Sequence, residues 1–216
     1  MTEFKIKSNP SEALTMPSKF YTDPLIYQKS INNIFSNSWQ LITHTNTLEK
    51  NNVYPFTLLK DSLNEPLVIT KNNEKITCLS NVCTHRGHIV CQQAENISRL
   101  QCKYHGRTFD LLGKIKAIPG FEGAKDFPSD KDNLSEIELK PWNKFIFVSL
   151  NPSIKISPVF EDIENRLAWF PFDKISYNEK LSKIFHVDAH WALYCENFLE
   201  GMHIPYVHKG LAKEID

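Results

Sequence analysis

The chain has 216 residues, a formal net charge of zero at pH 7, and 41% hydrophobic residues. This length suggests one or two domains, and the neutral charge balance gives no reason to expect nucleic acid or an anionic membrane surface as a partner. No apolar run approaches the roughly 18 residues that a membrane helix needs, and the polar N-terminus lacks the apolar core of a signal peptide. We therefore expect a cytoplasmic protein that binds neither nucleic acid nor membrane.

The five cysteines agree with a reducing compartment, because their number is odd and their spacing is not that of a disulfide framework. Cys78, Cys91 and Cys195 are expected to act as small buried hydrophobic residues. The other two, Cys83 and Cys102, each precede a histidine by two or three residues.

The N-terminal part is expected to be an arm, residues 1–18, followed by a helix over residues 23–38. Asp23 is suited to capping this helix and Pro24 to its first position. Apolar residues then recur at helical spacing.

From Gln40 the pattern changes to short runs that predict strands between turns. Asn72-Asn73 is a plausible hairpin tip between two of these runs. Many short strands indicate a small antiparallel β architecture, a sandwich or barrel. The predicted strands are Gln40–Thr43, Val53–Leu59, Pro66–Thr70, Lys75–Leu79, Glu136–Leu139 and Lys144–Leu150.

Two short Cys/His groups lie inside this β region and predict a four-ligand metal site made of Cys83, His85, Cys102 and His105. Zinc sites with two Cys and two His usually pair Cys with Cys and His with His. Here each group contains one Cys and one His. That alternation suits a Rieske [2Fe–2S] centre, in which two thiolates hold one iron and two imidazoles hold the other.

The first group reads Cys83-Thr84-His85-Arg86-Gly87, and residues 108–114 follow the second group. Both stretches resemble the Rieske domain of the ring-hydroxylating and demethylating oxygenases, in their large (alpha) subunit. Gly87 and Gly106 are expected to take positive φ beside the ligands. Tyr104 either donates its hydroxyl near a cluster sulfur or packs as an aromatic ring beside the site. A loop at Pro119-Gly120 is expected to cover the cluster.

The sequence after Asn151-Pro152-Ser153 begins a second region. A short helix is predicted over Pro158–Trp169, an extended segment over Ile175–Val187, and a helix from Trp191 that ends near Pro205. Because Pro205 interrupts the chain between His203 and His208, both rings could converge on one ion. Two His with a carboxylate form the facial triad of non-haem Fe(II) oxygenases.

The run from Glu196 to His208 resembles the mononuclear-iron motif of the same alpha subunits. The resemblance implies that His203 and His208 are iron ligands and that Asn197 lies beside the iron. It also implies that Glu200 bridges, through hydrogen bonds, a Rieske His of one subunit to an iron-ligand His of the next. Glu rather than Asp at position 200 resembles the subgroup that acts on quaternary ammonium compounds.

The resemblance implies three segments: an N-terminal arm and helix (1–39), a mainly β Rieske domain (40–150), and the start of an α+β catalytic domain (151–216). An alpha subunit continues well beyond this motif and supplies its third iron ligand late. We therefore expect an N-terminal portion with an incomplete Fe(II) site that is inactive alone. The acids after His208 are Glu214 and Asp216.

The implied function of the parent protein is that of a mono- or dioxygenase component that depends on NAD(P)H. Electrons would pass from a reductase or ferredoxin to the [2Fe–2S] cluster, then to a mononuclear iron that activates O₂. A small organic substrate would be hydroxylated, dihydroxylated or demethylated by a homo-oligomer, a trimer. Two alternatives stay open: a Rieske ferredoxin that only carries electrons, and a binding module that holds zinc at the four Cys/His positions.

Overall fold

The computed structural model describes residue 4, residues 6–121 and residues 123–215. The described chain divides into two compact units. The β unit comprises residues 31–177, and the helical unit comprises residues 1–30 together with 178–216. Within the described residues, no helix has the length and apolar character that crossing a bilayer requires.

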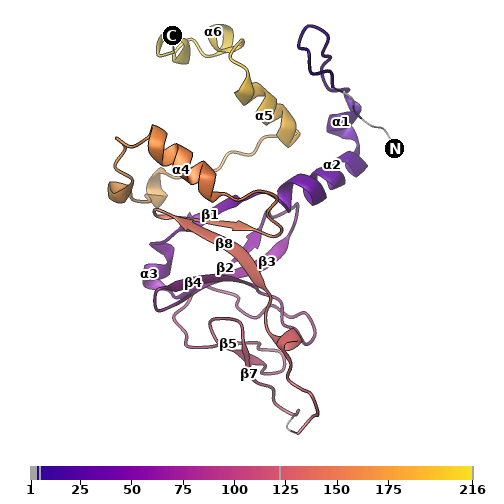
Figure 1. Ribbon diagram of the computed structural model, residues 1–216, viewed down its shortest axis with the longest axis vertical. Coiled ribbons are helices and arrows are strands. Elements are labelled where there is room, and N and C mark those ends of the chain that lie inside the picture. Colours follow the sequence, from indigo (N-terminus) through magenta and orange to yellow (C-terminus); the bar gives the residue numbers. More distant parts are fainter. Residues whose placement is uncertain (1–3, 5, 122, 216) are drawn as a thin grey trace. The chain divides into compact units, whose positions relative to one another are not determined.

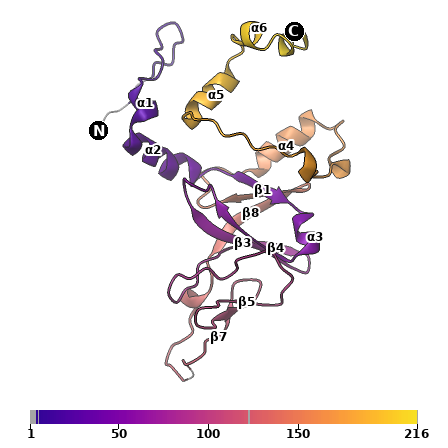
Figure 2. The ribbon, with the colours of Figure 1, turned by 180° about the vertical axis from the view of Figure 1, so that it is seen from behind.

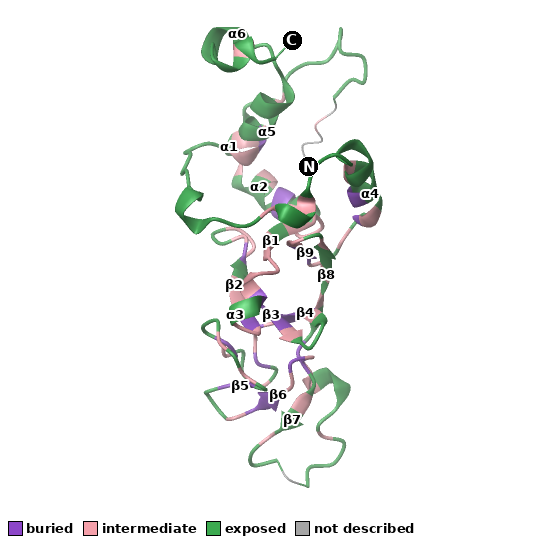
Figure 3. Cartoon of the chain, turned by 90° about the vertical axis from the view of Figure 1, so that its left-hand side faces the viewer, coloured by how far each residue is buried: buried purple, intermediate pink, exposed green. Residues whose placement is uncertain are grey.

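The β unit is built on a six-stranded antiparallel sheet with the order β1-β9-β8-β4-β3-β2. The sheet curls into a nearly closed barrel, as Figure 3 shows, with its buried residues at the centre of the strands. The mainly β fold expected from the sequence is confirmed. The strands are β1 (Gln40–His44), β2 (Val53–Leu58), β3 (Glu65–Asn72), β4 (Lys75–Ser80), β8 (Glu136–Trp142) and β9 (Phe145–Ser149).

The hairpin between β3 and β4 turns one residue later than the tip predicted at Asn72-Asn73. Asn72 pairs with Lys75, so the loop consists of Asn73 and Glu74. Asn73 has φ of +54°, a left-handed conformation that asparagine tolerates better than most residues.

Strand β3 has consecutive buried residues because both faces of the sheet are covered. Leu67 and Ile69 pack with Ile146 and other residues inside the barrel. Val68, which points to the opposite face, joins a second core that includes Cys83, Cys102 and Phe109. The second core is the base on which the two Cys/His loops rest.

A small sheet with the order β5-β6-β7 carries the second Cys/His loop. Figure 1 shows it at one end of the β unit, below β3 and β4. A hairpin follows the second loop, as β6 pairs with β7. Phe109 of β6 is completely buried and anchors this sheet on the second core. The strands are β5 (Leu100–Gln101), β6 (Thr108–Phe109) and β7 (Ile115–Ala117).

Short helices complete the β unit. The predicted helix after residue 157 forms as α4 (Ser157–Arg166), whose Phe160 stacks on Trp142 with ring centroids 4.9 Å apart. The strand pattern did not predict α3 (Thr47–Lys50), a single turn between β1 and β2 that Figure 2 shows beside the barrel. The other short elements are a π-helical turn (Ile31–Phe35) and 3₁₀ turns at Asp130–Asp132 and Phe172–Lys174.

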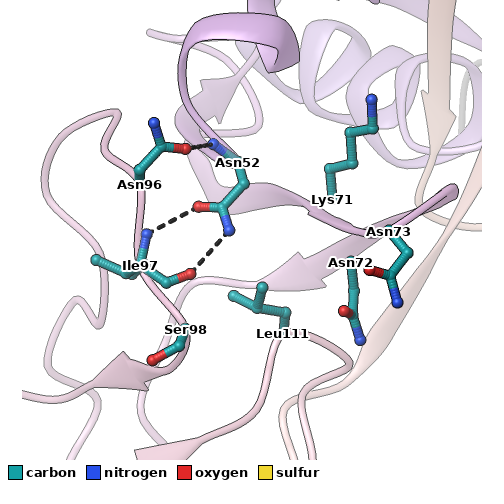
Figure 4. A pocket seen from close by; sticks show the side chains of 8 residues that line it. All are labelled: Asn52, Lys71, Asn72, Asn73, Asn96, Ile97, Ser98 and Leu111. Atoms are coloured by element: carbon teal, nitrogen blue, oxygen red, sulfur yellow. Dashed lines mark hydrogen bonds between the residues drawn. The ribbon is translucent and has the colours of Figure 1, made fainter.

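The start of β2 is tied to the loop before β5 by one amide side chain. Asn52 donates to the carbonyl of Ile97 at 2.8 Å and accepts from the backbone N–H of Ile97 at 2.9 Å (Figure 4). The Asn96 amide oxygen in turn accepts from the backbone N–H of Asn52 at 2.9 Å. These bonds form one wall of a polar pocket. Lys71 and Asn72 of β3 also line this pocket.

The helical unit contains the predicted first helix, which is α2 (Pro24–Ser30). Asp23 caps it as expected, since its Oδ1 accepts from the N–H of Leu25 at 2.9 Å. Together with the π-helical turn, helical structure covers residues 24–35 of the predicted 23–38. The other elements of this unit are α1 (Lys19–Thr22), α5 (Trp191–Leu199), α6 (Ile204–Val207) and 3₁₀ turns at Glu179–Leu181 and Leu211–Lys213.

An aromatic group joins the N-terminal helices to α5. His190 caps α5 by accepting from the N–H of Ala192 at 3.3 Å, and its ring lies 5.7 Å from Phe20. The hydroxyl of Tyr21 donates to the carboxylate of Glu196 at 2.8 Å. This bond is the largest of the effects that raise the pKa of Tyr21. Ionising the phenol would break the bond and place a second negative charge beside Glu196.

The predicted end of the last helix is wrong. Helix α5 ends at Leu199, well before Pro205. The carboxylate of Glu200 accepts from the backbone N–H groups of Met202 and His203, which competes with continuing the helix. Pro205 instead lies in the first turn of α6, where its missing N–H is harmless. The segment before α5 is extended as predicted, except for the turn at Glu179–Leu181.

Candidate metal centres

The two Cys/His loops of the β unit have the same backbone conformation. In the first, the N–H of Cys83 donates to the carbonyl of His88 at 2.8 Å, and the N–H of Gly87 donates to the carbonyl of Cys83 at 3.0 Å. In the second, Cys102 and Gly106 repeat these bonds at 2.8 and 3.0 Å. Each loop therefore closes on itself around its own cysteine.

Glycine is required at the end of each loop for a conformational reason. Gly87 has φ of +68° and Gly106 has φ of +75°, values that other residues rarely adopt. The positive φ expected from the sequence at both positions is confirmed. A Cβ on Gly106 would also lie 3.3 Å from the ring of Pro119, so the loop at Pro119-Gly120 lies against the second Cys/His loop.

The two cysteines of the loops lie buried, and their thiols are neighbours. Cys83 is 4% exposed and Cys102 is 2% exposed. Burial raises the pKa of Cys83, and the neighbouring Cys102 thiol raises it further. A hydrogen bond from the backbone N–H of His85 lowers the pKa but does not outweigh these effects. A buried thiol whose pKa is raised, as for Cys83, is poorly suited to stand uncompensated as a thiolate, whereas bound ferric iron supplies the opposing charge.

The two histidines of the loops lie above the cysteines, towards the surface. The rings of His85 and His105 have centroids 4.8 Å apart. Desolvation lowers the pKa of His85 most, and electrostatic repulsion from His105, Arg107 and Arg86 lowers it further. A lowered pKa favours the neutral imidazole, which is the form that binds metal.

These four residues have the arrangement that a binuclear cluster requires. Among the described residues no three His, Cys, Asp or Glu side chains converge on a single ion. A [2Fe–2S] cluster needs only two protein ligands at each iron, two thiolates at one and two imidazoles at the other. The buried thiol pair and the superficial imidazole pair fit that donor set.

Aromatic rings surround the imidazoles. Tyr104 is 56% exposed and its ring lies 3.8 Å from that of His105, centroid to centroid. This contact is aromatic packing, one of the two roles expected for Tyr104. The ring of Phe121, in the loop after Pro119-Gly120, lies 6.1 Å from that of His85.

The second candidate centre lies in the helical unit. His203 immediately precedes α6 and His208 immediately follows it. This single turn brings the two rings to a centroid separation of 5.2 Å with planes at 78°. The convergence of the rings therefore comes from the short helix between them, which begins after the break at Glu200.

Glu200 and Asn197 contact His203 directly. The imidazole Nδ1 of His203 donates to the Glu200 carboxylate, and the Asn197 amide nitrogen lies 3.3 Å from the same ring. Desolvation acts to raise the pKa of Glu200, but the hydrogen bonds from His203 and Met202 hold it below its usual value. Glu214 is exposed, and Asp216 lies outside the described residues.

Sequence reasoning missed the residues that fasten the cluster loops to each other. Arg107 and Asp132 form a largely buried ion pair at 3.3 Å, and Arg107 also donates to Thr84 of the first loop at 2.9 Å. These residues follow no recurrent spacing. The only signal in the sequence was an arginine directly after the second ligand group.

Comparison with known proteins identifies a Rieske domain and related oxygenases. A model of the Rieske [2Fe–2S] domain matches residues 38–128. Choline monooxygenase of Beta vulgaris is 28% identical over 99% of this chain. The carnitine monooxygenase oxygenase subunit of Escherichia coli is 27% identical over 96% of it. The chain therefore contains a Rieske [2Fe–2S] domain and is similar to the oxygenase subunits of Rieske monooxygenases. This similarity supports a [2Fe–2S] cluster and a mononuclear iron as its cofactors.

Solved structures of Rieske oxygenases share the fold. The quaternary ammonium Rieske monooxygenase CntA in complex with L-carnitine superposes with a TM-score of 0.76 at 22% identity, over 97% of this chain and 59% of that one. Naphthalene 1,2-dioxygenase from Rhodococcus sp. gives 0.70 at 21% identity, over 92% and 47%. The chain spans about half the length of the curated relatives it matches, 49% of the choline and 56% of the carnitine enzyme.

Proposed function

We propose that the chain is part of the oxygenase component of a Rieske mono- or dioxygenase that depends on NAD(P)H. It would receive electrons from a reductase or ferredoxin at a [2Fe–2S] cluster and pass them to a mononuclear iron. When bound, the cluster supplies single electrons and the mononuclear iron activates O₂. A small organic substrate would then be hydroxylated, dihydroxylated or demethylated.

One observation carries the proposal: two loops with the same hydrogen-bond pattern bring two buried thiols and two superficial imidazoles together. Cys83 and Cys102 would hold the inner iron, and His85 and His105 the outer one. The imidazoles at the surface would be the side from which electrons enter and leave. We propose residues 40–150 as the Rieske domain, between the arm at 1–39 and the start of the catalytic domain at 151–216.

In the helical unit, we propose His203 and His208 as iron ligands. Glu200 would orient His203 by accepting from its Nδ1, as carboxylates behind metal-bound imidazoles do. Asn197 would lie beside the iron, since its amide already contacts the same ring. A facial triad also requires a carboxylate ligand. No described Asp or Glu joins the two histidines to form such a group of three.

The substrate class we propose is a quaternary ammonium compound. The support is the named substrates of the relatives and a Glu at position 200, as in that subgroup. A homotrimer, a reductase or ferredoxin partner, and a cytoplasmic location belong to the same proposal. In a full-length version of the protein supplied with a reductase, NADH oxidation that depends on choline or carnitine would support this substrate class, whereas oxidation that depends only on naphthalene would contradict it.

The ligand set is tested on the chain purified without oxygen. The unsubstituted protein should contain two irons and two sulfides, with the visible absorption and electron paramagnetic resonance (EPR) spectrum of a Rieske centre. Cys102→Ser should abolish both signals. Cys91→Ser is the matched control, because Cys91 is equally buried in the same core. If Cys91→Ser rather than Cys102→Ser lost the spectrum, the ligand set would be wrong.

The same preparation decides between the proposal and the two alternatives. A colourless protein with one zinc and no sulfide would establish a zinc-binding module. In a full-length version of the protein, a normal cluster without Fe(II) bound at His203 and His208 would favour a carrier of electrons only.

A further inference from the structure

A buried cation lies beside the cluster loops. The side chain of Arg107 is 6% exposed and follows the second Cys/His group. Its guanidinium donates to the hydroxyl of Thr84 at 2.9 Å and to Oδ1 of Asp132 at 3.3 Å. Burying a guanidinium is costly unless charge and hydrogen bonds compensate it. Arg107 is therefore held at this place by specific partners.

The acid that compensates Arg107 is itself held in place. Oδ2 of Asp132 accepts from the backbone N–H of Ser129 at 2.9 Å and from its hydroxyl at 3.1 Å. These bonds, with the backbone N–H first, hold the pKa of Asp132 below its usual range, so the carboxylate is charged at neutral pH. The carbonyl of Asp132 also accepts from the hydroxyl of Thr84 at 2.7 Å.

Three segments thus meet at Arg107. Thr84 lies between the ligands Cys83 and His85, and the carbonyl of Arg107 accepts from the N–H of Cys102. The ring of Phe127 covers the guanidinium, 5.4 Å from Cζ to the centroid. Nε of Arg107 is buried without a hydrogen-bond partner among the described residues. A hydrocarbon side chain would fill this space without that penalty, so packing alone does not explain an arginine here.

We propose that Arg107 is a positioning residue with an electrostatic role: it fastens the two cluster loops together, and its charge, balanced by Asp132, sets the cluster's reduction potential. The inference rests on the proposed cluster. Reduction adds one negative charge to the cluster. A fixed cation close by stabilises the reduced form, and a fixed anion destabilises it, most strongly where water is excluded.

Two substitutions should shift the potential in opposite directions. Arg107→Met removes the cation and should lower the potential. Asp132→Asn keeps the shape and the acceptor Oδ1 but removes the anion, and should raise it. Each shift should amount to at least about tenfold in the reduction equilibrium, which is 59 mV for one electron. Arg107→Lys keeps the charge and should leave the potential nearer to the unsubstituted value than Arg107→Met does.

The control is Lys116→Met, which breaks a more exposed ion pair of the same unit, Lys116 with Asp110 at 3.0 Å. The measurement is a redox titration of the purified, cluster-loaded chain, followed by absorption and EPR, with iron and sulfide content determined for each variant. The control should retain the unsubstituted potential and spectrum.

Shifts of the reduction potential in opposite directions for Arg107→Met and Asp132→Asn, each larger than any shift in the Lys116→Met control, support the inference. Equal potentials, or shifts of the same sign for Arg107→Met and Asp132→Asn, in cluster-loaded protein would overturn it and leave the proposed function intact. If Arg107→Met cannot hold a cluster, Asp132→Asn decides: a raised potential supports the inference, and an unchanged one overturns it. If the unsubstituted chain binds no [2Fe–2S] cluster, both the inference and the proposed function are wrong.

Discussion

The imidazole Nδ1 of His203 donates to the carboxylate of Glu200, and the same carboxylate accepts from the backbone N–H of Met202 at 2.6 Å. One side chain therefore ends a helix and orients a proposed iron ligand. Because Nδ1 is engaged by Glu200, the proposed bond from His203 to iron would be made by Nε2.

Glu200→Gln tests this coupling. In a full-length version of the protein with Fe(II) in excess, both metals should stay bound, but reoxidation of the reduced cluster by O₂ in the presence of substrate should slow by about 10- to 100-fold. The control is Glu196→Gln, whose carboxylate bonds to Tyr21 instead of a histidine. Stopped-flow absorption follows the cluster. If Glu200→Gln lost Fe(II) while its cluster was reoxidised at the normal rate, the coupling role would be contradicted. Glu200 would then be an iron ligand.

Two glycines with the same backbone conformation test the packing beneath the cluster loops. Gly113 and Gly120 have φ of +82° and +83°. A Cβ on Gly113 would lie 2.9 Å from Leu79 Cδ2 and 3.1 Å from the carbonyl oxygen of Leu134, whereas one on Gly120 would meet nothing within 4 Å.

Gly120→Ala should lower the free energy of unfolding by about 1 kcal/mol, the cost of the left-handed backbone. Gly113→Ala should lower it by about 2–4 kcal/mol, because overpacking adds to that strain. Urea denaturation measures both. Equal losses would show that the contact of Gly113 with Leu79 and Leu134 is not tight in solution.

Asp110 should make the β unit sensitive to acid. Desolvation raises its pKa, but the hydrogen bonds from Lys116 and from the N–H groups of Lys114 and Leu112 outweigh this and lower it. A carboxyl group whose pKa is lower in the folded state stabilises the fold above the unfolded pKa of about 3.9. That contribution is lost as the pH falls through the lower, folded-state pKa.

Asp110→Asn should therefore destabilise the protein at neutral pH by about 1 kcal/mol. It should also reduce the further loss of stability below about pH 4. Urea denaturation at a series of pH values measures both effects. Asp126→Asn, at an exposed carboxylate, is the control and should keep the slope of the unsubstituted protein. If Asp110→Asn lost stability below about pH 4 as steeply as the unsubstituted protein, the acid sensitivity would come from other carboxylates.

The strands could be predicted from the sequence because β-branched and aromatic runs are interrupted by turn residues, as at Asn73. The helix end at Leu199 could not, because a side chain rather than a proline stops it. Glu200 competes for the N–H groups of Met202 and His203, and helix propensity says nothing of this competition.

The cluster ligands could be proposed from spacing because each Cys/His pair is local. The pairing of Arg107 with Asp132 could not, because it joins loops that are distant in sequence and follows no period. Helix α3 could not be predicted either, because a single turn is too short to show a helical pattern.

Cysteine reactivity gives an independent test of the fold. The expectation that Cys195 is buried is wrong, since Cys195 is exposed, whereas Cys78 is buried as expected and burial raises its pKa to about 12. At neutral pH, iodoacetamide should modify Cys195 first and leave Cys78 unmodified until the protein unfolds, because the thiolate is the reactive form. Mass spectrometry of peptides identifies the modified residue. Modification of Cys78 before Cys195 would show that β4 opens in the native state.

Removing iron with a chelator frees the thiols of Cys83 and Cys102, which should then be labelled more slowly than Cys195 because they stay buried, while Cys78 remains protected in β4. Simultaneous labelling of all three would mean that the sheet itself depends on the cluster.

Each Cys/His loop is closed by two backbone hydrogen bonds of its own, which do not involve metal. These bonds hold the ligands in place within each loop, so little conformational freedom remains to be lost when the cluster assembles. In a zinc finger, by contrast, the ion itself supplies the folding energy. We therefore expect cluster delivery to follow folding as a separate step, with the folded apo-protein as the acceptor of a preassembled cluster.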